Sequence, residues 1–74
     1  MSSKANAMSS VRIEIDEALA ALLQDTQQPV QAAAREMIVL ELYRRGAISS
    51  GRAGELLGTS RLAFIRRASS LGIP

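Results

Sequence analysis

The sequence predicts a mainly α-helical fold with one short N-terminal strand followed by about four helices, the last two forming a helix-turn-helix. Three observations predict it: apolar residues recur at helical spacing along most of the chain, glycines follow such runs, and residues 11–15 alternate between apolar and polar side chains. A chain of 74 residues without cysteine or histidine buries roughly 60% of its unfolded surface and lacks disulfides and the usual metal ligands. We therefore expect a single small domain that forms a homodimer.

Residues 1–10 are small and polar, and we expect them to be a disordered leader to the domain of residues 11–74. In the next segment, Val11, Ile13 and Ile15 lie on one side of a predicted half-buried strand. Because no other strand is predicted, its backbone groups would stay unpaired, so we expect it to pair with the same strand of a second chain. The alternative is an extended arm that lies over its own helices.

A short amphipathic helix follows this strand. Asp16 is placed to act as the N-cap of this helix, because its carboxylate can accept a hydrogen bond from a backbone N–H of the first turn. The apolar residues of this helix are Ala18, Leu19, Leu22 and Leu23. The polar residues 25–28 end it, and Pro29 suits the first turn of the next helix.

Residues 30–45 form the predicted long helix, which Gly46 ends. From residue 37 to 43 its apolar side chains spread around most of the circumference, which is typical of a helix packed on most sides. We therefore expect Met37 and Leu40 to join the apolar face of the strand in the dimer interface, so that residues 11–45 serve dimerisation.

Residues 46–74 carry the predicted helix-turn-helix, and Ser49 is the expected N-cap of its first helix. The apolar face of its first helix consists of Ala53, Leu56 and Leu57. Gly58 suits the turn because glycine tolerates positive φ, and Thr59 or Ser60 can cap the second helix. The apolar face of the second helix consists of Phe64, Ala68 and Leu71. Any small helical hairpin can show such a turn, which is the alternative interpretation.

The charge distribution favours DNA binding over an ordinary hairpin. Residues 42–74 contain six arginines and a single acid, Glu55, a net charge of +5, whereas residues 1–41 contain three basic and six acidic residues, a net charge of −3. A basic half is what phosphate contact requires.

Side chains early in the second helix of a helix-turn-helix are placed to reach base edges. The predicted base-reading residues are Ser60, Arg61, Leu62 and Arg66. Arginine can donate two hydrogen bonds to guanine, each good pair being worth roughly 1–3 kcal/mol of discrimination. The predicted phosphate contacts are Arg44, Arg45, Arg52 and Arg67. For each arginine the alternative is a solvated helix face.

Residues 11–45 also match a ribbon-helix-helix dimer, whose paired strands enter the major groove. That interpretation requires basic or amide side chains on the outward strand face. Arg12, Glu14 and Asp16 stand there instead, and the two acids would repel phosphate. We expect the strand to dimerise and the helix-turn-helix to read DNA.

Other classes of function lack the residues that they need. Without histidine or cysteine, and with glycines that stand singly, we expect no enzyme, no metal and no cofactor. No run approaches the roughly 18 apolar residues that span a bilayer, and the N-terminus lacks the apolar core of a signal peptide, so we expect a cytoplasmic protein without a membrane partner.

Residues 11–74 resemble the small prokaryotic uncharacterised protein family (UPF) one-seventy-five. The motifs that carry the resemblance are ELY at 41–43, IS at 48–49, AGELLG at 53–58, SR at 60–61, Phe64 and GIP at 72–74. Members are regarded as helix-turn-helix, antitoxin-like proteins and as partners of PIN-domain ribonuclease toxins. Gly54 stands where the family usually has alanine, which would loosen the first helix by roughly 0.5–1 kcal/mol, and Arg67 stands where an apolar residue is usual.

The resemblance implies an antitoxin that represses its own toxin–antitoxin operon. Together with the basic helix-turn-helix, it predicts a DNA-binding, antitoxin-like transcriptional regulator whose partners are double-stranded DNA, a second copy of the chain and a PIN-type toxin. The alternative is a protein-interaction module, toxin-neutralising or adaptor, without sequence-specific DNA binding.

Overall fold

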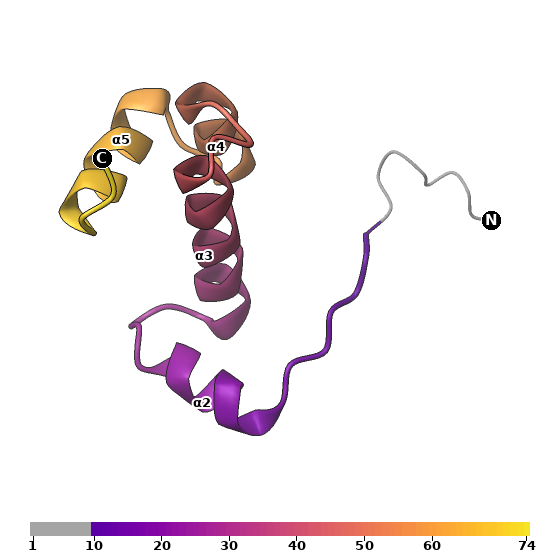
Figure 1. Cartoon of the computed structure of the whole chain (residues 1–74). Helices are drawn as coiled ribbons and strands as arrows, with labels where there is room; N and C mark the ends of the chain where they lie inside the picture. Colours follow the sequence, from indigo (N-terminus) through magenta and orange to yellow (C-terminus); the bar gives the residue numbers. More distant parts are fainter. Residues whose placement is uncertain (1–9) are drawn as a thin grey trace.

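The computed structural model of the chain describes residues 10–74, so the predicted leader lies almost wholly outside the described residues (Figure 1). Within 10–74 there are four helices and no strand: α2 (Glu17–Gln24), α3 (Val30–Arg44), α4 (Ser50–Leu56) and α5 (Arg61–Ser70). The prediction of a mainly helical chain is confirmed. Residues 10–16 are neither helix nor strand in the single chain and lead away from the helices (Figure 1). A strand formed with a second chain stays a prediction.

Helix α2 begins at the predicted cap. The Asp16 carboxylate accepts a hydrogen bond from the backbone N–H of Leu19 at 2.8 Å, and Glu17 adds negative charge to the first turn, where the helix dipole favours it. The helix packs against α3. Leu23 is buried there, whereas Leu22 remains 67% exposed.

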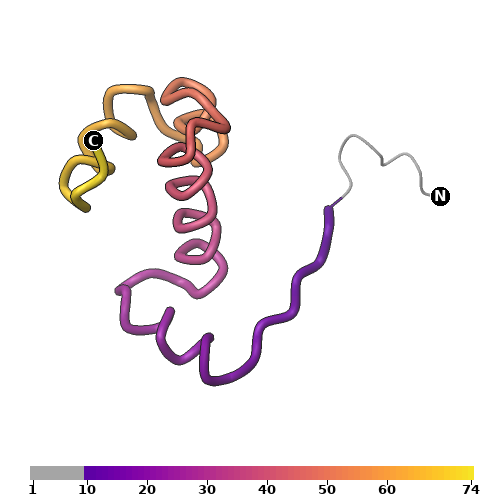
Figure 2. Tube along the Cα trace, in the orientation of Figure 1, coloured from indigo at the N-terminus to yellow at the C-terminus, as the bar shows by residue number. Residues whose placement is uncertain are grey.

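Helix α3 forms the central rod of the molecule, with α2 at one end and the α4–α5 pair at the other (Figure 2). It starts after Pro29 and ends at Arg44, one residue earlier than predicted. Its packing is one-sided within the single chain: Val39 and Leu40 are buried, whereas Met37 and Ile38 are each 50% exposed. In the single chain, α3 is therefore packed on one side, and not on most sides as its sequence had predicted.

Helices α3, α4 and α5 end in the same way, with a glycine in the left-handed region. At the end of α4, Gly58 has φ +69°, its N–H donates to the carbonyl of Glu55 at 3.1 Å, and the N–H of Thr59 donates to the carbonyl of Gly54 at 2.8 Å. This pair of bonds is a Schellman motif, which satisfies the last carbonyls of a helix. Gly46 and Gly72 end α3 and α5 with the same pair of bonds.

The core lies where α3, α4 and α5 meet. It consists of Val39, Leu40, Ala53, Phe64 and Ala68, all buried. Leu40 was predicted to lie in the dimer interface, but at 6% exposure it belongs to the core of its own chain. The reason is the one-sided packing of α3, which turns Leu40 toward α4 and α5.

The two aromatic residues of the chain pack on each other at this core. The rings of Tyr43 and Phe64 meet edge to face, with centroids 5.0 Å apart at an interplanar angle of 88°, an arrangement favoured by the ring quadrupoles. After α5 the chain turns at Gly72 and brings Ile73 against the core, while Leu71 is 46% exposed. Ile73 thus takes the packing role that helical spacing predicted for Leu71.

No helix within the described part of the chain has both the length and the apolar character needed to cross a membrane.

Candidate nucleic-acid interface

Serine side chains fix the starts of α4 and α5. The hydroxyl of Ser49 accepts the backbone N–H of Arg52 at 3.0 Å, and the hydroxyl of Ser60 accepts that of Ala63 at 3.1 Å. The predicted cap at Ser49 is confirmed, and of the two candidates for the second cap the chain uses Ser60. Because a hydroxyl can accept and donate at once, Ser60 still has an O–H donor for a further partner.

The turn between the two helices lies directly against Gly54. A Cβ atom added at this glycine would stand 2.9 Å from the carbonyl oxygen of Thr59 and 3.0 Å from that of Ser60. The sequence suggested only that Gly54 loosens α4. Its contacts show a second effect, since the missing side chain lets the backbone of the turn approach α4 closely and so sets the distance between the two helices.

Helix α5 has a buried face and an open face. Phe64 and Ala68 are each 1% exposed in the core, whereas Leu62 is 55% exposed and Arg66 is also exposed. Arg61, the first residue of α5, reaches back to α4, where its Nε–H donates to the hydroxyl of Ser50 at 3.0 Å. The four predicted base-reading residues therefore lie on α5 and its cap, with Leu62 and Arg66 one turn apart on the exposed side of the helix.

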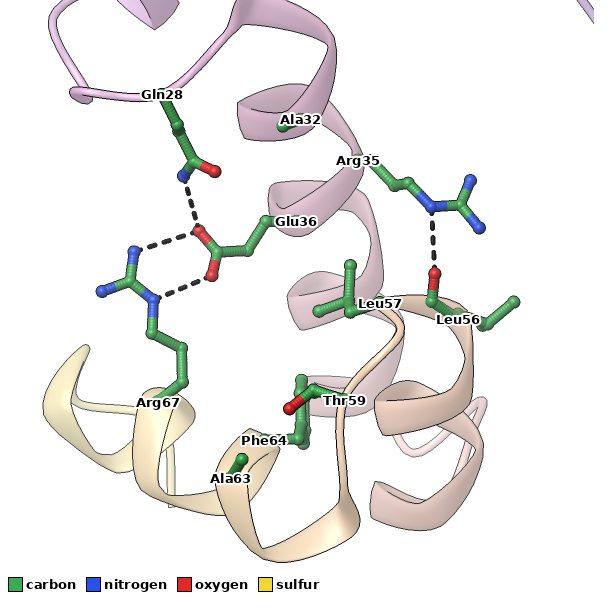
Figure 3. Close-up of a pocket in the computed structure, with 10 residues that line it drawn as sticks. All are labelled: Gln28, Ala32, Arg35, Glu36, Leu56, Leu57, Thr59, Ala63, Phe64 and Arg67. Atoms are coloured by element: carbon green, nitrogen blue, oxygen red, sulfur yellow. Dashed lines mark hydrogen bonds and ion pairs between the residues drawn. The ribbon is translucent and has the colours of Figure 1, made fainter.

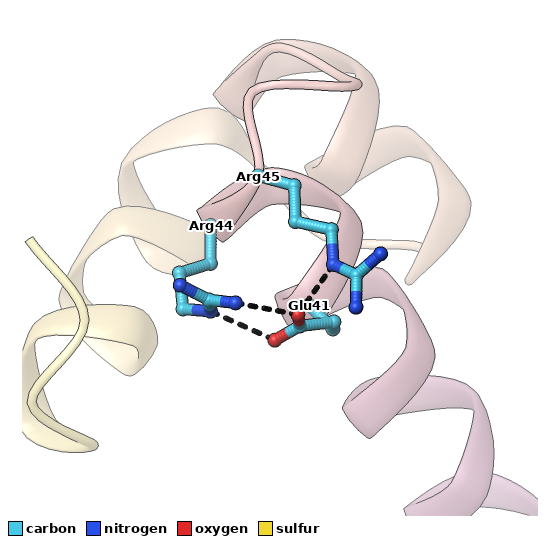
Figure 4. Close-up of polar contacts among 3 residues, drawn as sticks. All are labelled: Glu41, Arg44 and Arg45. Atoms are coloured by element: carbon cyan, nitrogen blue, oxygen red, sulfur yellow. Dashed lines mark hydrogen bonds and ion pairs between the residues drawn. The ribbon is translucent and has the colours of Figure 1, made fainter.

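At the end of α3, two of the predicted phosphate contacts share one carboxylate (Figure 4). Arg44 donates to Glu41 through Nε at 2.8 Å and Nη2 at 2.7 Å, and Arg45 donates to the same carboxylate through Nε at 2.6 Å. These hydrogen bonds, with the arginine charges, lower the pKa of Glu41 to about 2. One carboxylate neutralises one of the two cations, so this cluster keeps a net positive charge.

Arg52, on α4, pairs with Glu55 one turn further on at 3.0 Å, and both side chains are more than half exposed. An exposed ion pair of this kind contributes roughly 0–1 kcal/mol. Replacing its carboxylate by a phosphate therefore costs little.

Arg67 differs from these three arginines because its partner lies on another helix (Figure 3). Its guanidinium donates to Glu36 of α3 through Nε at 2.8 Å and Nη2 at 3.0 Å, and Gln28 donates to the same carboxylate at 3.0 Å. The Glu36 side chain is only 17% exposed. Hydrogen bonds from Arg67 lower the pKa of Glu36, although burial opposes the shift. Arg67 thus ties α5 to α3, and because its side chain is still 48% exposed, phosphate contact by Arg67 stays a prediction.

Arg35 is a positioning residue that sequence reasoning missed. Its Nε–H donates to the carbonyl of Leu56, the last residue of α4, at 3.0 Å (Figure 3). A cation at this end satisfies a carbonyl that has no partner within the helix and suits the negative end of the helix dipole.

Arg35 and Arg67 stand at the edge of a groove of about 340 Å³ between α3, α4 and α5, which is mainly apolar inside. Sequence reasoning missed the contact of Arg35 with Leu56 because no spacing rule links residues 21 positions apart.

The predicted dimerisation residues, apart from Leu40, are open in the single chain. Val11 is 89% exposed, Ile13 71%, Ile15 38% and Met37 50%. On α3, Met37 belongs to a shallow groove of about 390 Å³. The groove is lined by Met37, Ile38, Glu41, Leu42 and Arg45.

Comparison with known proteins gives one match. The model of the family described as Uncharacterised protein family (UPF0175) matches residues 8–74, which agrees with the resemblance inferred from the motifs. No curated protein and no solved structure matches the chain.

Proposed function

We propose that this chain, which belongs to the Uncharacterised protein family (UPF0175), is a DNA-binding regulator. It acts as a homodimer that lays α5 in the major groove of double-stranded DNA. In this proposal the base-reading residues are Ser60, Arg61, Leu62 and Arg66.

One observation carries this proposal. Of the six arginines between residues 42 and 74, four form ion pairs with carboxylates, and the two that do not, within residues 10–74, are Arg61 and Arg66 on α5. A guanidinium without a carboxylate partner carries an uncompensated charge, and all its donors in Arg66, and all but Nε–H in Arg61, remain for an external partner. Because α5 is anchored through Phe64 and Ala68, these donors stand on a rigid, exposed helix, as base readout requires.

Phosphate contact falls to Arg44, Arg45 and Arg52 in this proposal. The carboxylate partner of Arg52 is 70% exposed, so a phosphate can replace it at little cost. Arg44 and Arg45 share one carboxylate, so their cluster keeps a net positive charge that a phosphate can meet. Such contacts add affinity and salt dependence but do not select a sequence.

The dimer is proposed to form through residues 11–15, paired as strands, and through Met37 and its apolar neighbours on α3. Burying these side chains would remove apolar surface that one chain leaves in water. Ile38→Glu tests this surface: we expect sedimentation or light scattering to show a monomer, while circular dichroism retains the helices. A wild-type chain that is monomeric at high micromolar concentration would contradict the dimer.

Action as an antitoxin rests on the family resemblance alone. It would place the protein in the cytoplasm as a non-enzymatic repressor of its own operon, with a PIN-type toxin as protein partner. Co-purification with the product of a neighbouring PIN-type gene tests this part separately.

DNA binding is tested by fluorescence anisotropy with a labelled duplex from the native upstream region and a scrambled duplex of equal length. We expect tighter binding to the native duplex, and a steep loss of affinity between roughly 50 and 200 mM salt. Arg66→Ala should reduce the preference about tenfold or more, the loss of one bidentate base contact. Arg52→Ala is the matched control, since it removes an exposed arginine from α4 and should weaken binding to both duplexes equally.

A second candidate, a protein-interaction module without sequence-specific DNA binding, is favoured by the exposed apolar side chains of α2 and α3. It predicts equal, weak binding of the native and scrambled duplexes at physiological salt. That result would overturn the first proposal.

A further inference from the structure

The first turn of α4 and the first residue of α5 meet through one side-chain hydrogen bond. The Nε–H of Arg61 donates to the hydroxyl of Ser50 at 3.0 Å. The stem of Arg61 crosses the same turn, because a Cβ added at Gly51 would stand 4.0 Å from its Cδ. The hydrogen bond to Ser50 therefore holds a side chain whose stem passes close to the first turn of α4.

Ser50 is available for this contact because Ser49, one residue earlier, caps α4. The Ser50 side chain has no other hydrogen bond to residues within the described part of the chain. Its half-buried position limits the directions that its hydroxyl can take. Arg66, by contrast, forms neither a side-chain hydrogen bond nor an ion pair with residues 10–74.

This contact determines which edge of the guanidinium remains free. Arginine has five N–H donors, and the bond to Ser50 uses the one on Nε. The two terminal nitrogens keep a pair of parallel N–H groups, which match the O6 and N7 acceptors of guanine. Holding the side chain beforehand reduces the rotamer entropy that base contact would otherwise cost.

We propose that Ser50 is a positioning residue that aims Arg61 at a guanine and so sets the base preference at one position of the DNA site. This inference rests on the proposed function. It adds to it a residue outside α5 and a specific base for Arg61.

The contact itself can be tested without DNA. In the free protein, Ser50→Ala should shift the Nε–Hε resonance of Arg61 in a ¹⁵N-edited NMR spectrum and leave that of Arg66 in place. Ser50→Thr keeps the hydroxyl and should restore the wild-type position. An unchanged Arg61 resonance in Ser50→Ala would overturn the positioning role.

Its consequence is tested on duplexes selected from a random library with the wild-type chain. Anisotropy on point variants of the selected duplex should give one position where Arg61→Ala removes a preference for guanine. Ser50→Ala should lower that preference about fivefold, the effect of one hydrogen bond, and leave other positions unchanged. With Arg61→Ala already present, adding Ser50→Ala should change nothing further.

The outcomes separate the two proposals. Equal loss of affinity for all duplexes in Ser50→Ala overturns this inference and leaves DNA binding by α5 intact. Failure of the wild-type chain to prefer any duplex overturns the proposed readout and this inference with it. Urea unfolding of Ser50→Ala should match the wild type, because Ser49 still caps α4.

Discussion

The two halves of the molecule use similar apolar residues with different results. In the C-terminal half, Ala53, Phe64 and Ala68 are almost wholly buried against the end of α3. In the N-terminal half, α2 buries Leu23 alone, and Val11 and Leu22 are 89% and 67% exposed. The sequences of both halves have amphipathic patterns. The halves differ in burial because α3 covers the apolar faces of α4 and α5, whereas no helix of the same chain covers most of the apolar side chains of residues 11–24.

This contrast suggests that the two halves have different roles. The C-terminal half completes its own core and can present arginines from a fixed helix. The N-terminal half leaves apolar side chains in water and is completed, in our proposal, by a second copy.

Phe64→Ala should have the largest effect. The side chain is 1% exposed and packs against Tyr43, so its removal should lower the free energy of unfolding by about 3–5 kcal/mol. Leu22→Ala, at 67% exposure in α2, should change it by less than about 0.5 kcal/mol at concentrations where the chain is monomeric. Urea unfolding followed by circular dichroism measures both. Equal losses would show that α2 is as much part of the monomer core as α5.

Gly54→Ala and Gly51→Ala compare two glycines of the same helix. A methyl at Gly54 would meet backbone oxygens of the turn at 2.9–3.0 Å, whereas one at Gly51 would meet side-chain atoms at 3.9–4.0 Å. We expect Gly54→Ala to lower the free energy of unfolding by about 1–3 kcal/mol, since the turn must move. Gly51→Ala should raise it by about 0.5–1 kcal/mol through helix propensity. Thermal melts of the two variants measure the difference. A stabilised Gly54→Ala would mean that the turn relaxes freely.

Local signals in the sequence predicted the local structure well. The caps at Asp16 and Ser49 and the turns at Gly46 and Gly58 depend on residues within a few positions of each other, and each forms as expected. Charge clustering likewise pointed to the arginines of residues 42–74. These features need no knowledge of how helices pack.

The features that were missed depend on packing between helices. Neither the bond from Arg35 to Leu56 nor the pairing of Arg67 with Glu36 follows from a spacing rule, since 21 and 31 positions separate the partners. The burial of Leu40 depends in the same way on which side of α3 receives α4 and α5. The other three arginine–carboxylate pairs join residues three or four positions apart on one helix, a spacing that sequence can supply. Only the fold shows that Arg67 also has a carboxylate partner, whereas Arg61 and Arg66 do not.

The smallest expected effect concerns the tie between α5 and α3. Hydrogen bonds from Arg67 lower the pKa of Glu36, so the folded state favours the ionised carboxylate. This contribution to stability is present above the pKa of Glu36 in the unfolded chain and is lost as the pH falls through its lowered value in the folded chain. Because Arg67 is 48% exposed, we expect about 0.5–1 kcal/mol.

Glu36→Gln should therefore lower the free energy of unfolding at neutral pH by this amount, and its difference from the wild type should shrink near pH 3. Glu55→Gln, which removes the carboxylate of an exposed pair on α4, is the matched control and should change stability little at either pH. Glu41, whose pKa is about 2, remains in both variants and cancels from the comparison. Urea unfolding at the two pH values measures these differences. An equal loss at both would assign the effect of Glu36 to its packing and its bond with Gln28, and would leave α5 held by the apolar core alone.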